Sequence, residues 1–250
     1  MQPTRHHVAA VALTVLVGGT ASAQHSPAGI IRVSSEVLDS IQSIPLKSIP
    51  PALLADAQGI AIIPNVIKGG FVVGGRVGHG LVLSRNPDGS WGGPAFVTLG
   101  GASVGLQAGV QSTDIILVFK SRTSLERVLK GKGKVTLGAD VAVAAGPVGR
   151  QAEAGTDAKL KAEIYSYSRS RGLFAGVSLE GAAILYDAGA NQEYALNPQP
   201  EVIAAAERLK AQVTAGGRMP VVAPPPVLVP APVPMQPVLP PLPPPPPPPG

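Results

Sequence analysis

The chain contains no cysteine, and this absence removes several classes of protein at once. A disulfide-stapled fold, a lipoprotein acylated on cysteine and a thiolate metal or redox site are all excluded. Histidine is also scarce, because beyond position 23 it occurs only at His25 and His79. A zinc site needs converging His, Cys or carboxylate ligands, and the sequence shows no such spacing. We therefore expect no metal, no cofactor and a domain that folds by burial alone.

Aromatic residues and net charge are both low for a protein that binds nucleic acid. One Trp, four Tyr and four Phe offer little surface for stacking bases, and the net charge is only +5. No general acid and base pair can be located from residue spacing. The glycine-rich segment 69–76 lacks the Lys-Ser/Thr ending of a phosphate-binding loop. These absences favour a protein that is not an enzyme and has no nucleic-acid partner.

The apolar run near the N-terminus is too short to cross a membrane as a helix. It covers ten residues, 8–17, whereas a membrane span needs about 20. A basic start at Arg5 precedes it, and the small residues Ala21-Ser22-Ala23 that follow are typical of a cleavage site. Residues 1–23 are predicted to be a cleavable signal peptide, with a retained membrane anchor as the alternative. We expect the protein to be exported and to be periplasmic or secreted.

Proline is abundant at the other end of the chain. From Pro220 to Gly250 there are 17 prolines among 31 residues and no charged side chain. Such a segment cannot form a ladder of backbone hydrogen bonds and favours extended polyproline II. Residues 218–250 are therefore predicted to be a disordered proline-rich tail. The tail is either a spacer or a docking segment for a protein partner.

Between these ends, the apolar patterns indicate helices around a sheet. Apolar residues at helical spacing follow a Ser-Pro start at Ser26 and recur in the segment 197–217. A short central helix is expected at Thr123-Ser124-Leu125-Glu126, with Gly131 as its end. Alternating apolar runs rich in glycine fill much of the region 59–187. Because glycine weakens a strand, these glycines indicate strong curvature or close approach of another backbone.

The predicted fold class is α+β. We expect a strongly curved, mostly antiparallel, glycine-rich sheet, open or barrel-like, with peripheral N-terminal, central and C-terminal helices. The predicted boundaries are 24–196 for the domain and 197–217 for a C-terminal helix that follows it.

A first candidate binding site is a basic cluster at the end of the short central helix. Arg127, Lys130, Lys132 and Lys134 lie close together in the sequence. Cations at this position complement the helix dipole, which requires no ligand. The functional reading is a patch for phospholipid headgroups, where each basic residue near an anionic surface contributes about 1 kcal/mol.

A second candidate site is the pair Arg169 and Arg171. The two residues are two positions apart on an expected strand, so both lie on one face and could form a fork for a phosphate. The alternative is a structural ion pair with an acidic residue in apolar context, for which Asp114 and Glu180 are the candidates.

Four segments of the chain resemble a known family. They are 59–64 (Gly-Ile-Ala-Ile-Ile-Pro), 68–75 (Lys-Gly-Gly-Phe-Val-Val-Gly-Gly), 146–150 (Gly-Pro-Val-Gly-Arg) and the long glycine-rich stretch 166–181 with its two arginines. In this order and at these distances they resemble the SYLF domain, over roughly residues 30–190. That family is described as lipid-binding and is also catalogued under the actin-binding activity of its eukaryotic members.

Taken with the predicted signal peptide and the lack of a catalytic constellation, the resemblance favours an exported, non-enzymatic lipid-binding protein that acts at a membrane surface through anionic phospholipid headgroups. In eukaryotic SYLF proteins a basic amphipathic N-terminal helix is the main lipid-binding element. The corresponding helix here carries Arg32 alone against Glu36 and Asp39, so its apolar stripe can instead pack on the sheet. The alternative function is a structural or interaction protein of the cell envelope that uses its proline-rich tail. Actin binding rests on family analogy only.

Overall fold

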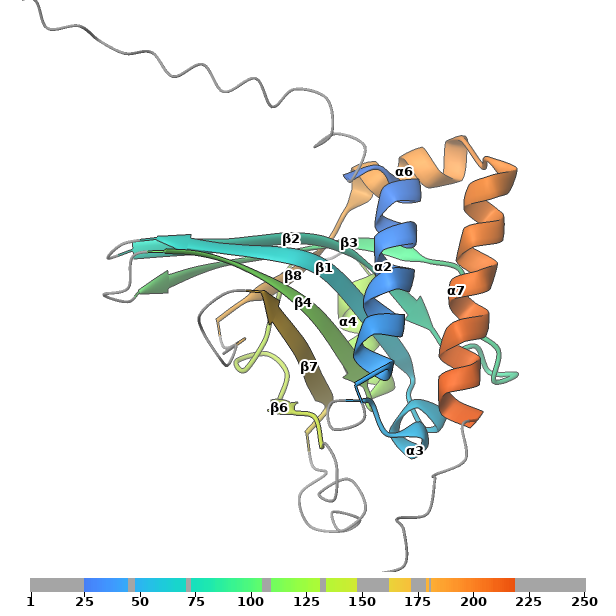
Figure 1. Ribbon diagram of the computed structural model, residues 1–250, viewed down its shortest axis with the longest axis horizontal. Helices are drawn as coiled ribbons and strands as arrows, with labels where there is room; N and C mark the ends of the chain where they lie inside the picture. Colours follow the sequence, from blue (N-terminus) through green and yellow to red (C-terminus); the bar gives the residue numbers. More distant parts are fainter. Residues whose placement is uncertain are drawn as a thin grey trace, which may run out of the picture. The chain divides into compact units, whose positions relative to one another are not determined.

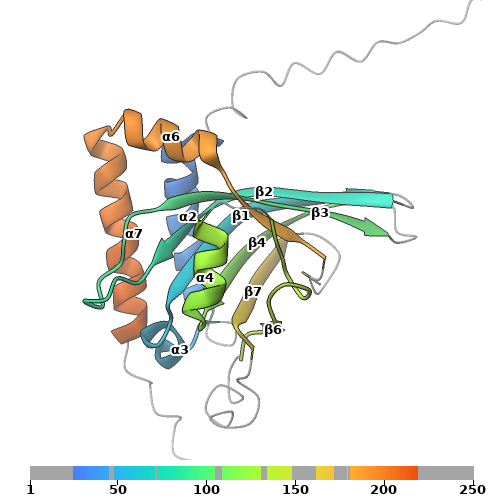
Figure 2. The same cartoon turned by 180° about the vertical axis from the view of Figure 1, so that it is seen from behind.

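The computed structural model describes residues 25–44, 48–70, 73–104, 109–130, 134–147, 162–171, 179 and 181–218. The predicted signal peptide and the proline-rich tail from residue 219 onward lie outside these ranges. Within them, no helix combines the length and the apolar character needed to cross a lipid bilayer. The described part is a curled sheet with helices on both of its faces (Figure 1, Figure 2).

The sheet has eight strands in the order β5-β8-β3-β2-β1-β4-β7-β6. Their bounds are β1 Gly59–Gly70, β2 Val73–Ser84, β3 Ala95–Val104, β4 Gly109–Phe119, β5 Val135–Thr136, β6 Val143–Ala145, β7 Ile164–Arg171 and β8 Ala183–Tyr186. All neighbouring strands are antiparallel except β6 and β7, which are parallel. The predicted α+β class and the curved, mostly antiparallel sheet are confirmed.

The helices are divided between the two faces of the sheet. Their bounds are α2 Pro27–Gln42, α3 Pro51–Ala55, α4 Arg122–Leu129, α6 Ala188–Leu196 and α7 Pro200–Arg218. Helices α2 and α7 stand side by side on one face (Figure 1), and α4 lies against the other (Figure 2). We call these the α2 face and the α4 face of the sheet.

The two faces carry separate apolar cores because strand side chains alternate. On β1, Ile60 and Ile62 pack on the α2 face, whereas Ala61 and Ile63 pack on the α4 face. Both cores are completely buried along this strand. Whether a residue occupies an odd or an even position along its strand therefore decides which of the two cores its side chain joins.

Helix α2 forms where its sequence pattern predicts it. Ser26 caps the helix by accepting a hydrogen bond from the backbone N–H of Gly29 (3.2 Å), and Pro27 occupies the first turn. Its apolar stripe, including Leu38 and Ile41, is buried against the sheet and α7. The predicted packing role of this stripe is confirmed.

Two helix predictions need correction, and one helix was not predicted. The central helix α4 is capped by Ser121, whose hydroxyl accepts from the backbone N–H of Ser124 (3.3 Å), so Thr123 is not its cap. Helix α7 begins at Pro200 rather than at 197 and continues to Arg218, and Gly216 is packed inside it against Leu54. Helix α6 is not predicted by the sequence, because none of its residues is buried and it has no apolar stripe.

Glycines at two positions of β2 allow close approach between strands. A Cβ atom at Gly80 would collide with the carbonyl oxygen of Ile62, and one at Gly78 would lie 2.7 Å from Cγ2 of Val66. Real Cβ atoms do not approach other atoms so closely, so only glycine fits there. The predicted role of glycine in close backbone approach is confirmed for this strand.

Candidate functional site

Strands β1 to β4 continue beyond α2 as an arm (Figure 1). The arm consists of the paired segments 67–70, 73–77, 100–104 and 109–113. Among the described side chains of the arm, three large apolar ones are exposed, namely Ile67 (42%), Val77 (50%) and Val110 (78%). Ile67 is opposite Val77 in the β1–β2 register, and Val110 is opposite Gly69 of β1. These three residues lie on the α2 face, and we call them the apolar strip.

A β-bulge in β1 separates the arm from the part of the sheet that α2 covers. The register shifts between Ile63 and Val66, at Pro64 and Asn65. Proline has no N–H to donate to the ladder, which favours an irregularity at this position. Asn65 has φ 49°, and it is the only non-glycine residue with positive φ in the described ranges. Its backbone N–H donates to Oδ1 of Asp114 (3.0 Å), so a side chain on β4 holds the bulge.

Asp114 is in turn held by Arg169, one of the predicted site residues. Asp114 is 1% exposed, and its Oδ2 accepts from Nη2 (2.8 Å) and Nε (3.2 Å) of Arg169. The two residues are register partners in the β4–β7 pairing. A buried carboxylate requires such a charged partner. The expected structural ion pair is therefore present, and Asp114 is the acid that forms it.

Arg171 is described by its backbone alone. It lies at the end of β7, opposite Ser112, two positions from Arg169 and so at the same parity. Glu180 and positions 172–178 lie outside the described residues.

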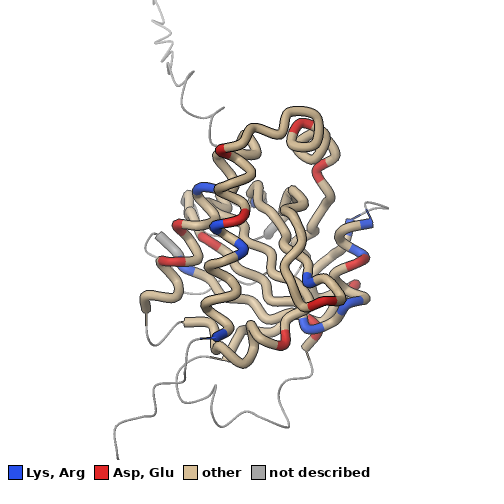
Figure 3. The backbone as a smooth tube through the Cα atoms, turned by 90° about the vertical axis from the view of Figure 1, so that its right-hand side faces the viewer, with Lys and Arg blue, Asp and Glu red and all other residues tan. Residues whose placement is uncertain are grey.

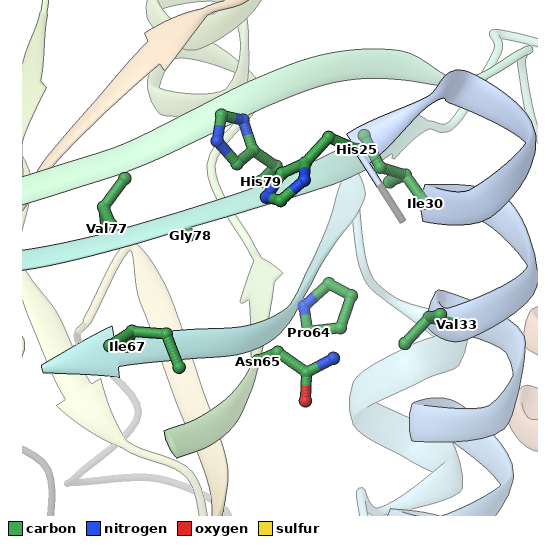
Figure 4. Close-up of a pocket in the computed structure, with 9 residues that line it drawn as sticks. All are labelled: His25, Ile30, Val33, Pro64, Asn65, Ile67, Val77, Gly78 and His79. Carbon is green, nitrogen blue, oxygen red and sulfur yellow. The ribbon is translucent and has the colours of Figure 1, made fainter. Parts of the chain in front are cut away.

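A small pocket lies between α2, the bulge and β2 (Figure 4). Its volume is about 100 Å³, and it is lined by His25, Ile30, Val33, Pro64, Asn65, Ile67, Val77, Gly78 and His79. Most of these side chains are apolar, and two of them belong to the apolar strip. The pocket therefore opens where the covered sheet meets the arm.

The imidazole of His79 stands at one side of this pocket, edge-to-face with the ring of His25 at a centroid distance of 4.8 Å. The hydroxyl of Thr98 lies 3.2 Å from Nδ1 of His79 and donates to Oδ2 of Asp187 (3.3 Å). Burial lowers the pKa of His79, the nearby His25 lowers it further, and Asp187 acts in the opposite direction. At neutral pH this imidazole is uncharged.

The predicted basic cluster lies at α4, on the other face of the sheet. Lys130 and Arg122 both contact Glu126, with Nζ and Nε at 2.7 Å and 3.2 Å from its two carboxylate oxygens. Arg127 donates to the backbone oxygen of Asp140 (2.9 Å). Such exposed ion pairs contribute little to stability. Lys134 is exposed, and Lys132 lies outside the described residues.

The structure thus does not bring the predicted site residues together. Arg169 shares the α2 face with Asp114 and the pocket, whereas the cations of α4 are on the α4 face. Along the described backbone, basic and acidic positions are interspersed (Figure 3). Within the described ranges, no group of three His, Cys, Asp or Glu side chains could hold a metal ion.

The pocket and the apolar strip are the features that sequence analysis missed. One signal for the bulge is present in the sequence, since Pro64 interrupts the strand motif 59–64. The strip has no such signal, because Ile67 and Val77 look like ordinary core residues of alternating strands.

The described elements define an α+β domain built on a curled, glycine-rich antiparallel sheet. Residues 100–213 match the family model described as "Ysc84: Las17-binding protein actin regulator". Over these residues the chain is similar to this family, which is the SYLF domain family that its motifs resemble.

Curated relatives carry the same family name. Protein YSC84 of Saccharomyces cerevisiae is 43% identical over 148 residues, which cover 58% of this chain and 31% of that protein. The SH3 domain-containing YSC84-like protein 1 of Bos taurus is 37% identical over 167 residues, which cover 67% of this chain and 48% of that protein. The chain thus spans about a third to a half of the length of these relatives. No solved structure matches the chain.

Proposed function

We propose that this chain is a non-enzymatic SYLF-domain protein that binds anionic membrane surfaces. The observation that carries the proposal is the apolar strip, which α2 leaves exposed although its neighbours on the same strands are buried. Contiguous exposed apolar side chains are typical of a surface that contacts a membrane or a partner. The lipid binding described for the SYLF family favours the membrane.

Charge supports an anionic surface. The net charge of the chain is +5, and the exposed cations at α4 attract anionic lipid within a Debye length of about 8 Å at roughly 0.15 M salt. Because the strip and α4 are on opposite faces, the strip makes the apolar contact and the α4 cations add only a weaker, screened attraction. Arg169 serves this site indirectly, since it holds Asp114 and thereby the bulge.

The location of the protein is part of the proposal. The short apolar run and the residues Ala21-Ser22-Ala23 support export with cleavage after Ala23. The intact mass of the exported protein should then correspond to a chain that begins at Gln24. Exported material that retains Met1 would contradict this.

A protein partner is the alternative function. The description of the family model names Las17 binding and actin regulation for the proteins it represents. In this chain, the feature that favours a protein partner is the proline-rich tail, with 17 prolines among the residues from Pro220 to Gly250. Under this alternative the tail docks a partner or spaces the domain from a surface.

Vesicle flotation tests the membrane proposal. The purified protein is floated with phosphatidylcholine vesicles that contain or lack phosphatidylserine, at low and high salt. Replacing Ile67, Val77 and Val110 together by serine should weaken binding about tenfold or more. Full burial of one such side chain contributes about 1.5–3 kcal/mol, so partial insertion of three exceeds the 1.4 kcal/mol of a tenfold change.

A matched control is available on other elements. Leu185, Leu196 and Ile203 are also exposed, at 41%, 75% and 41%, and replacing them by serine should leave flotation unchanged. Charge reversal of Lys130, Lys132 and Lys134 should weaken binding to the anionic vesicles. Binding to the neutral vesicles and its salt dependence should not change. Equal flotation of the wild type and the strip variant would refute the proposed surface.

A further inference from the structure

We propose that the pocket between α2, the β1 bulge and β2 binds the end of a single aliphatic chain, such as a fatty acid or a phospholipid carries. This inference rests on the proposed membrane function and deepens it, because it assigns a specific subsite for one chain of an amphiphile.

The first argument is the size and lining of the pocket. Ile30, Val33, Pro64, Ile67 and Val77 surround a volume of about 100 Å³. An engineered apolar cavity of about 150 Å³ is known to remain dry and to bind benzene, so this pocket suits a small apolar group rather than a polar headgroup. The side chains labelled in Figure 4 come from three separate elements around one opening.

The second argument is the continuity of the pocket with the arm. Ile67 and Val77 line the pocket and are also half-exposed on the apolar strip. Val110 on β4 continues the same face, because it is opposite Gly69, which lies two residues after Ile67 on β1. A chain whose end is in the pocket can therefore lie along the strip.

The third argument is that two glycines on this track have no packing reason. Gly100 on β3 is opposite Val77 on β2, and Gly75 lies two residues before Val77 on β2. Both glycines therefore lie on the α2 face, as Val77 does. Among the described residues, a Cβ atom at Gly100 would meet nothing within 4 Å, and one at Gly75 would meet only the carbonyl oxygen of Gly101 at 3.8 Å. Glycine weakens a strand, and at these positions the fold does not require it. Their absent side chains keep the surface beside the strip open for a ligand.

The pocket is also held in shape from behind. Asn65 lines it in a left-handed conformation, and the buried Asp114–Arg169 pair fixes its backbone. Backbone conformations of this kind are maintained only where surrounding contacts determine them, and they are concentrated at functional sites. The opening is therefore preorganised, which reduces the ordering cost of binding.

The test uses two probes with the same chain length, sodium dodecanoate and lauroyl lysophosphatidylcholine, each below its micelle concentration. Binding is measured by calorimetry and by methyl NMR. The wild type should bind at least one probe, with shifts of the Ile67, Val77 and Ile30 methyl groups and none at Val213 between α7 and the core. Binding of dodecanoate alone identifies a free fatty acid as the source, and binding of the lysolipid identifies a membrane lipid.

Two variants separate ligand binding from folding. Val33→Phe fills the pocket, and Gly100→Val fills the track where the added side chain has open space. Each should weaken probe binding by about tenfold or more, and Gly100→Val should retain the melting temperature. Ser168→Val is the matched control, because it adds a similar side chain at an exposed strand position of the other face.

Absence of methyl shifts in the wild type would overturn the inference, as would unchanged probe binding in both Val33→Phe and Gly100→Val. Vesicle flotation of the same proteins distinguishes this failure from failure of the proposed function. A wild type that floats without binding either probe contradicts the pocket alone. A wild type that binds a probe without floating contradicts the membrane function and leaves the pocket supported.

Discussion

The covered part of the sheet and the arm are made from the same four strands, yet they differ in what stabilises them. Under α2 and α7, alternate side chains such as Ile62 and Leu83 are fully buried on one face while their neighbours are buried on the other. On the arm, residues of the same type and spacing are exposed. An alternating apolar strand therefore marks a buried core only where a second layer covers it.

The β1 bulge and the pair Asp114–Arg169 lie at the junction of these two regions. We expect substitutions at this junction to change the stability of the protein most, and substitutions farther from it to change stability less.

Replacing Arg169 by methionine should destabilise the protein by about 3–5 kcal/mol, because it leaves the buried carboxylate of Asp114 without its charged partner. Chemical denaturation measures the change. The double variant Asp114→Asn with Arg169→Met should recover much of the loss, since it removes both charges and retains an acceptor for Asn65. A single variant as stable as the wild type would show that the pair does not hold the junction.

Core and arm should respond differently to truncation of a side chain. Leu38→Ala on α2 should cost about 2–5 kcal/mol, because Leu38 is fully buried and its removal leaves a cavity. Val110→Ala on the arm should change stability by no more than about 0.5 kcal/mol, because Val110 is 78% exposed. Equal losses measured by thermal denaturation would contradict the contrast between the two regions.

Acidification should weaken the contact between α2 and the sheet near the pocket. The pKa of His79 is lowered in the folded state, chiefly by burial, while an unfolded histidine titrates at about 6.5. Above that pH the imidazole is neutral in both states and stability is complete. Below it the unfolded state takes up the proton more readily, so stability falls. The melting temperature should therefore drop from about pH 7.5 to about pH 5.5 more in the wild type than in His79→Gln. Parallel losses would exclude His79 as the cause.

The smallest effect is expected at α4. Lys130 is 66% exposed and pairs with Glu126 four residues earlier, so Lys130→Ala should cost no more than about 0.5 kcal/mol. Differential scanning calorimetry can detect a larger loss, which would mean that the cations of α4 support the fold and are not simply available to a ligand.

Local patterns predicted the elements well where one residue spacing decides the outcome. The stripe of α2 has helical period and is buried as a stripe, and the turn residues from Asn86 to Gly89 join β2 and β3 as a hairpin. Local pattern did not predict helix α6, which is capped by Asp187 and has no apolar face. Such a helix depends on contacts with other elements and not on apolar periodicity. For example, the side-chain amide of Asn191 accepts a hydrogen bond from the backbone N–H of Phe96 and donates one to its carbonyl oxygen.

The candidate site was less predictable than the fold. Sequence analysis proposed the α4 cations and the pair Arg169 and Arg171 as two candidate headgroup sites, and whether either contacts lipid stays a prediction. Their separation onto two faces follows from strand register and from a helix that crosses beneath the sheet, and no sequence spacing contains that information. The bulge adds a further shift, since it changes which face every later residue of β1 serves.

The sequence by itself indicated the resemblance to the SYLF family, the α+β class and the amphipathic helices, because each depends on residue identity or on spacing within one segment. Only the tertiary structure decided that Asp114 meets both Asn65 and Arg169, that Ile67 and Val77 remain exposed, and that Gly100 faces open space. These features depend on which strands pair, in which register, and where the covering helix ends. They are contacts between segments far apart in the chain, and hydrophobic pattern alone cannot specify them.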